Sequence, residues 1–154
     1  MKQKISIYEM LEEARHYHNC LCDEEEAIKI CEQVLEKDPE NIDALLIKAG
    51  SLPHINKEKE AFQLTESIIE KWPNHWEAYY LMGVLLFNTN ENMAMQNFNK
   101  SISLKKTFDN SISAAQLSYF LKQPDYKRYL FYAKEIDPSR YACYMKNCWE
   151  WEVC

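Results

Sequence analysis

The chain has 154 residues and a formal net charge of −6, and it is long enough for one domain with a hydrophobic core that needs no disulfides. Residues 1–77 hold nine Lys or Arg against seventeen Asp or Glu, whereas residues 78–154 hold nine against seven. This acidic first half, with no basic stripe after it, argues against nucleic acid as a partner. No apolar run is long enough to span a bilayer and no signal-peptide pattern is present, so we expect a cytoplasmic protein without a membrane segment.

Glycine and proline are scarce, with two and five residues, and this favours helices over a sheet that would need frequent turn residues. Helices are predicted at 6–19, 24–37, 42–51, 57–71, 75–88, 91–105, 109–121, 125–136 and 139–151. Asp23, Asn56 and Asn90 are expected to act as N-caps. The spacings of Asp23 with Glu26 and of Asn74 with Glu77 also resemble capping boxes. Pro53 is expected to end the third helix early.

A repeat of about 34 residues runs through the chain. Ala27 and Ala61 are one period apart, as are Pro39 and Pro73. Shorter copies continue through Ala94 and end at Pro138. We place the repeats at about 8–41, 42–75, 76–108 and 109–138 of a single domain. A C-terminal capping helix at about 139–151 is predicted from an apolar stripe of Tyr141, Tyr144, Met145, Cys148 and Trp149.

The pattern within each copy resembles the tetratricopeptide repeat (TPR). The third copy fits best, with Tyr79, Met82, Gly83, Ala94, Phe98 and Ser101. The second has Leu45, Ala49, Ala61, Ile68 and Pro73, whereas the first and fourth copies are degenerate. The resemblance implies an all-α fold, a right-handed α-solenoid of antiparallel helix pairs. Small residues would let helix axes approach, while larger ones fill the space around them.

In this family the first helix of each pair lines a concave groove. The resemblance therefore implies ten candidate partner-binding residues: Glu9, Glu12, Asp43, Leu46, Glu77, Tyr80, Val84, Phe87, Leu117 and Phe120. The same faces would include His16, Gly50, Asn110 and Ser113. The implied groove is acidic at one end and aromatic at the other, which suits a basic or amphipathic segment. Alternatively, the aromatic residues belong to the core and the acidic ones to an ordinary solvated surface.

Some members of the family hold a C-terminal carboxylate with Lys and Asn. The matching positions here are Glu12, His16, Leu46 and Tyr80, which offer no Lys or Arg. A carboxylate-terminated partner is therefore not expected.

His16, His18, Cys20 and Cys22 are all good zinc ligands. On a helix, however, a spacing of two residues turns successive side chains about 200° apart, so at most two or three of them could converge. We expect exposed histidines and buried, reduced cysteines, with neither a metal nor a cofactor. No motif for a catalytic nucleophile, a phosphate loop or a metalloprotease helix is present, so an enzyme is not expected.

Three functional hypotheses remain open at this level. The first is a protein-binding adaptor or chaperone. The second is an immunity or inhibitor protein that covers a cationic toxin enzyme, and the third is a zinc-dependent role of the cluster from His16 to Cys22. A homodimer through the terminal helices is compatible with each hypothesis.

Overall fold

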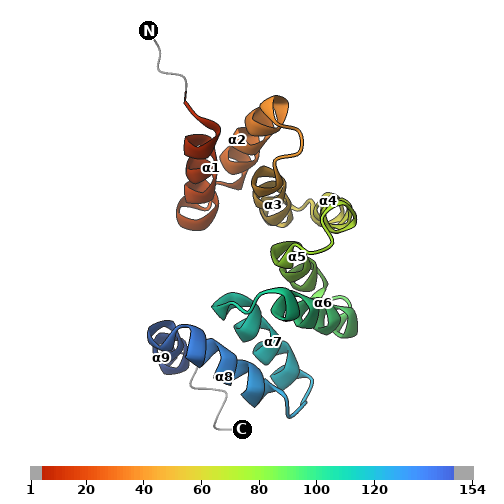
Figure 1. Ribbon diagram of the computed structural model, residues 1–154, viewed down its shortest axis with the longest axis vertical. Coiled ribbons are helices and arrows are strands. Elements are labelled where there is room, and N and C mark those ends of the chain that lie inside the picture. The colour runs from red at the N-terminus through yellow and green to blue at the C-terminus, as the bar shows by residue number, and fades with distance from the viewer. Residues whose placement is uncertain (1–4, 148–154) are drawn as a thin grey trace.

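The computed structural model describes residues 5–147 (Figure 1). Within this range the chain forms nine α-helices and no strand. Their bounds are α1 Ile7–His16, α2 Glu24–Lys37, α3 Ile42–Ser51, α4 Glu58–Lys71, α5 Trp76–Leu86, α6 Glu91–Leu104, α7 Phe108–Phe120, α8 Tyr126–Ile136 and α9 Pro138–Asn147. A π-helical turn, Tyr17–Leu21, follows α1, and a 3-10 turn, Leu52–Ile55, follows α3.

The helix predictions are confirmed, most of them to within two residues at each end. The first helix is shorter than expected, because its last turn widens into the π-helical turn. Pro53 lies in the 3-10 turn directly after α3, as its effect on helix geometry predicts. Cys148 and Trp149, which were expected to extend the apolar stripe of the last helix, lie outside the described residues.

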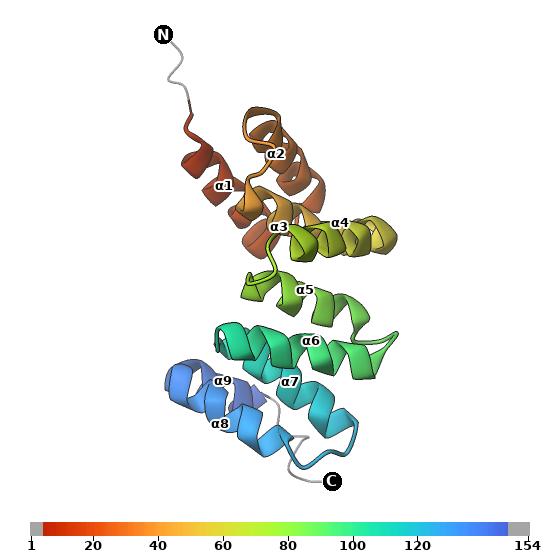
Figure 2. The ribbon, with the colours of Figure 1, turned by 45° about the vertical axis from the view of Figure 1, so that its right-hand side comes forward.

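The helices form an all-α solenoid of successive antiparallel pairs (Figures 1 and 2). The odd-numbered helices lie along the inner side of the curve, and α2, α4 and α6 lie along the outer side. The curvature brings α1 and α9, at opposite ends of the described chain, to the same side of the molecule (Figure 1). This arrangement leaves a concave side that is bounded by α1 at one end and α9 at the other.

Side-chain caps begin several of the helices. Asp23, Asn41 and Asn90 each accept a hydrogen bond from a backbone N–H of the first turn that follows. The predictions for Asn56 and Asn74 are wrong. Asn56 has a φ of 60° and ends the 3-10 turn, and α4 then begins after Lys57 without a side-chain cap. Asn74 lies one residue too early, because α5 begins after His75.

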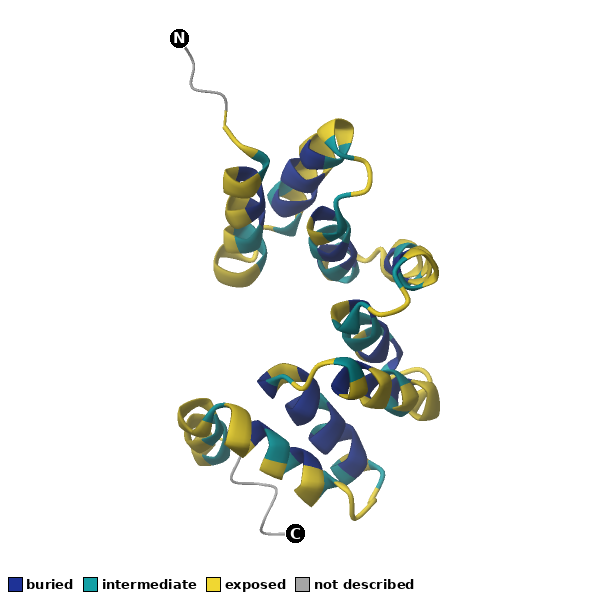
Figure 3. Cartoon of the chain, viewed as in Figure 1, coloured by how far each residue is buried: buried dark blue, intermediate teal, exposed yellow. Residues whose placement is uncertain are grey.

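The core is divided into clusters that successive helices share, which appear as dark blue faces between neighbouring helices in Figure 3. The largest cluster joins α5, α6, α7 and α8 around Phe98, whose side chain has no exposed surface. The small residues of the repeat, Ala27, Ala49, Ala61 and Ala94, are likewise fully buried. No helix pair encloses its own apolar face, so each pair depends on its neighbours for stability.

Candidate functional site

A hollow of about 610 Å³ opens on the concave side. It is lined by residues of α1, the π-helical turn, α3, α5, α7 and α9, namely Arg15, His18, Asn19, Leu46, Ile47, Gly50, Trp76, Glu77, Tyr80, Leu81, Asp109 and Arg140. We call this the concave hollow. Its walls come from the first helix of each pair and from the last helix, so residues from opposite ends of the chain meet around one space. The lining combines apolar and charged side chains.

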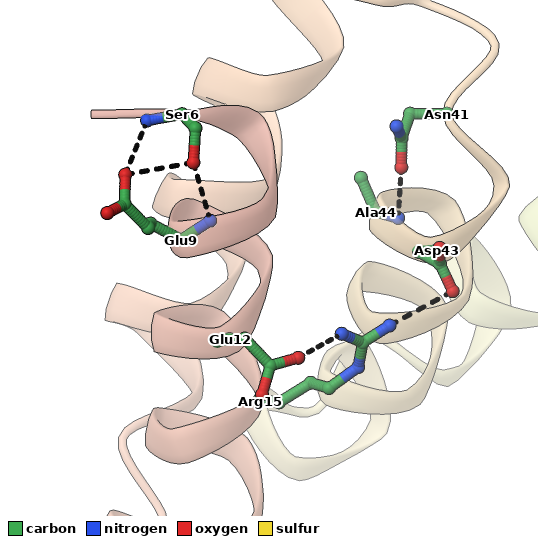
Figure 4. Close-up of polar contacts among 7 residues, drawn as sticks. All are labelled: Ser6, Glu9, Glu12, Arg15, Asn41, Asp43 and Ala44. Carbon is green, nitrogen blue, oxygen red and sulfur yellow. Dashed lines mark hydrogen bonds and ion pairs between the residues drawn. The ribbon is translucent and has the colours of Figure 1, made fainter. Parts of the chain in front are cut away.

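Three of the ten candidate partner-binding residues, Leu46, Glu77 and Tyr80, line the concave hollow, as does Gly50, which was expected on the same faces. Two others, Glu12 and Asp43, lie beside it, because both form ion pairs with Arg15 (Figure 4). Glu9 has a structural task instead. Its carboxylate accepts hydrogen bonds from the backbone N–H and the hydroxyl of Ser6 at 2.8 Å each, which completes a capping box at the start of α1 (Figure 4).

The remaining expected groove residues do not line the concave hollow. Leu117 and Asn110 are fully buried, because α7 is packed between its neighbours and presents most of its faces to the core. Phe87 is half-buried, with its ring centroid 6.3 Å from that of Phe98. Val84 is exposed but lies outside the lining. The placement of Leu117 and Asn110 on the groove surface is therefore wrong.

Phe120 is exposed, but it belongs to a different place on the surface. It lies with Tyr119, Pro124 and Tyr126 around a second, mostly apolar hollow of about 720 Å³ at the turn between α7 and α8. The aromatic end of the expected groove is therefore divided: Tyr80 lines the concave hollow, Leu117 lies in the core and Phe120 lines the second hollow.

His18 and not His16 faces the concave hollow, because the π-helical turn rotates the residues that follow α1. Its Nδ1 lies 2.7 Å from Glu24 Oε2 and 3.0 Å from Ser51 Oγ, so the imidazole ties the turn to the start of α2 and the end of α3. Cys20 and Cys22 are exposed free thiols, so the expectation that they are buried is wrong: the π-helical turn and the loop after it carry them away from the core. Between residues 5 and 147 no three His, Cys, Asp or Glu side chains are arranged to hold a metal ion.

Two titratable groups in the concave hollow are perturbed by their surroundings. Burial against the walls raises the pKa of the Glu77 carboxyl, an effect that nearby His75 opposes and Asp43 reinforces. Burial also raises the pKa of the Tyr80 phenol, while a hydrogen bond with Ser113 lowers it. Glu77 is nevertheless exposed to solvent. Its carboxylate therefore lies at the open, partly apolar wall of the hollow and not in an enclosed core.

Comparison with solved structures identifies the architecture. A thermophilic TPR protein of Thermus thermophilus superimposes with a TM-score of 0.75 at 13% identity, over 86% of this chain and 75% of that one. MamA of Desulfovibrio magneticus superimposes with a TM-score of 0.61 at 18% identity, over 84% and 73% of the two chains. The chain has a TPR fold. At these identities the likeness establishes the fold alone. Neither a protein-family model nor a curated protein sequence matches the chain.

The concave face of this TPR fold holds two arginines that the sequence analysis missed. Arg15 of α1 reaches Asp43 of α3 with an Nη2–Oδ1 distance of 3.0 Å (Figure 4). Arg140 of α9 reaches Asp109 of α7 with an Nη2–Oδ1 distance of 2.7 Å. Arg15 occupies a position where the family pattern has a small residue, and this departure from the pattern could have identified it as a candidate residue of the concave face. Arg140 was missed because the last helix was interpreted only as a cap, although it forms a wall of the concave hollow.

None of the helices described for this TPR fold is both long enough and apolar enough to cross a membrane.

Proposed function

We propose that this protein is a non-catalytic protein-interaction module, an adaptor or chaperone in the cytoplasm, that holds a basic or amphipathic segment of another protein in the concave hollow. The observation that carries the proposal is the composition of the hollow's walls. Apolar side chains of Leu46, Ile47 and Leu81 stand beside the Glu77 carboxylate, the Tyr80 phenol and an accessible backbone at Gly50. A segment with an apolar face and a polar edge could satisfy both kinds of surface.

The repeat architecture supports this proposal. The chain shares its fold with TPR proteins, and the concave surface of such a solenoid is one on which a few side chains can decide what is bound. The acidic character of the first half of the chain adds a preference for cationic partners. Free thiols at Cys20, Cys31 and Cys143 are compatible with a reducing compartment.

The test is site-specific photo-crosslinking in cells. A benzophenone amino acid at position 80 or 81 should crosslink to a partner, whereas the same group at Phe131, an exposed residue of α8, should not. Gly50→Leu should reduce the crosslinked product, because a side chain at Gly50 points toward His18 and fills part of the hollow. Equal crosslinking from positions 80 and 131, unaffected by Gly50→Leu, would argue against a binding site in the concave hollow.

A further inference from the structure

Three carboxylates occupy the same position in successive repeats. Asp43, Glu77 and Asp109 are each the second residue of their helices, α3, α5 and α7. Glu77 and Asp109 line the concave hollow, and Asp43 lies close enough to Glu77 to raise its pKa. We call this set the acidic ladder. Because it crosses the middle of the concave side, its charge balance decides which ligands the hollow can accept.

The two outer members of the acidic ladder each form an ion pair within the chain. Asp43 is paired with Arg15, which also bonds Glu12 at 2.7 Å, and Asp109 is paired with Arg140. Each arginine comes from the helix at one end of the solenoid. The carboxylates of Glu12 and Asp43, at the N-terminal end of the hollow, therefore share one guanidinium group and are already engaged within the chain.

The central member, Glu77, forms no ion pair with any residue of the described chain. His75, Arg15 and Lys105 are near enough to lower its pKa, but the Lys105 ammonium lies over the ring of Trp76, 5.0 Å from the ring centroid, and Arg15 is paired with Glu12 and Asp43. Glu77 therefore presents a carboxylate without an ion-pair partner among the described residues, and Trp76 and Tyr80 of the same helix also line the hollow.

We propose that the concave hollow selects partner segments that place one lysine or arginine side chain on Glu77, with apolar residues beside it. This inference rests on the proposed function and specifies its partner chemistry. Around the hollow four carboxylates, Glu12, Asp43, Glu77 and Asp109, face only two guanidinium groups. A ligand cation corrects this imbalance, whereas an acidic ligand would worsen it.

The aromatic neighbours strengthen the choice of a cation. Trp76 already holds the ammonium group of Lys105 against its ring, so the local geometry accommodates a cation beside an aromatic face. The apolar side chains of Leu46 and Leu81 can cover the aliphatic part of a lysine or arginine. We therefore expect the preference for a lysine or arginine side chain to come from Glu77, in the middle of the hollow, and not from the total negative charge of the chain.

The experiment is a peptide selection on three matched proteins. A library of random dodecapeptides displayed on phage is panned against the parent protein, Glu77→Gln and Glu66→Gln, and bound peptides are eluted with the parent protein in solution. Glu66 is an exposed carboxylate of α4 outside the concave hollow, so its replacement removes the same charge from the outer side of the solenoid. Circular dichroism checks that all three proteins are folded.

Lys or Arg at one position, next to apolar residues, should be enriched at least about 10-fold on the parent and on Glu66→Gln, and the enrichment should disappear on Glu77→Gln. A factor of 10 corresponds to about 1.4 kcal/mol. The same cation preference on Glu77→Gln would overturn the inference while leaving the concave hollow as a binding site. Selected peptides that bind Gly50→Leu as well as the parent would instead contradict the proposed function.

Discussion

Gly83 faces Phe98 so closely that no side chain fits between them. A Cβ atom placed on Gly83 would lie 2.5 Å from both Cδ1 and Cε1 of the Phe98 ring, and the ring is fully buried. Side chains in such a packed core have no free volume into which they can move. This contact sets how closely α5 and α6 approach. It shows directly how a small residue of the repeat pattern makes room for a large one.

Gly83→Ala should therefore destabilise the protein, although alanine is the better helix former by about 1 kcal/mol. Overpacking a core costs about 1–3 kcal/mol, and here it opposes the gain in propensity. Urea denaturation followed by circular dichroism measures the difference.

Gly50→Ala is the control. Its Cβ would lie 3.6 Å from the nearest atom of His18, which is an ordinary contact. This variant should therefore be as stable as the parent or more stable. A Gly83→Ala variant at least as stable as the parent would show that the α5–α6 contact is looser than described.

The repeat pattern predicted the separate roles of these residues, with Gly83 small enough for helices to approach and Phe98 large enough to fill space, because repeat spacing and residue size are local information. The 34-residue period aligned Ala61 with Ala27, and both are buried in equivalent positions. Leu117 could not be placed in the same way, because its burial depends on how α7 is enclosed by α6 and α8, and the fourth repeat keeps too little of the pattern to show this. Arg140 is harder still, since its partner Asp109 is 31 residues away and the two meet only because α9 packs against α7.

Asn110 gives a second test, because its buried amide joins two helices. Its Nδ2 donates to Ser101 Oγ at 3.0 Å and to the Lys105 carbonyl at 2.8 Å, and its Oδ1 accepts from the Thr107 N–H at 2.9 Å. Asn110→Ala should cost about 1–3 kcal/mol, since buried partners lose their hydrogen bonds. Asn97→Ala, which removes a surface bond to the Met93 carbonyl, should cost about 0.5 kcal/mol or less in the same denaturation experiment. Equal losses for the two variants would refute a structural role for Asn110.

Cys31 should be chemically silent while the protein is folded. Its side chain is fully buried, and burial raises the pKa of the thiol to about 12, so the reactive thiolate is scarce at neutral pH. Pulsed alkylation with iodoacetamide at pH 8, read by mass spectrometry, should modify the exposed Cys20 and Cys143 first. Labelling of Cys31 should follow only at the rate of unfolding and should accelerate in urea. Labelling as fast as that of Cys143 in native buffer would contradict its burial.

The raised pKa of Glu77 predicts a pH-dependent stability difference. Because its folded pKa lies above its unfolded value, the folded state binds more protons than the unfolded state between the two values, and stability falls as the pH rises through this window. At pH values above this window, the ionised Glu77 carboxylate lowers the free energy of unfolding. Glu77→Gln should therefore melt at a higher temperature than the parent at pH 7, and the advantage should shrink as the pH falls through this window and be lost below about 4.

Thermal scans of both proteins from pH 3 to pH 8 measure the effect. The Glu66→Gln protein supplies the control, since Glu66 lies on α4 outside the concave hollow. A melting-temperature difference that stays constant over the whole pH range, or that grows toward low pH, would be inconsistent with a destabilising charge at Glu77.

Arg140 should hold α9 against α7 and so maintain one wall of the concave hollow. Its guanidinium bonds Asp109, and its Cζ lies 4.2 Å from the centroid of the Phe108 ring. Because the pair is exposed, Arg140→Ala should lower global stability by about 1 kcal/mol or less.

The local effect should be larger, since α9 has no fully buried residue and depends on half-buried contacts such as Tyr141 and Tyr144. Hydrogen exchange should therefore quicken in α9 and remain unchanged in α3. Arg140→Lys keeps the charge but loses the planar fork, so it should give an intermediate rate. Uniformly faster exchange over all described helices would indicate a global loss of stability. It would contradict a role of Arg140 in holding α9 against α7.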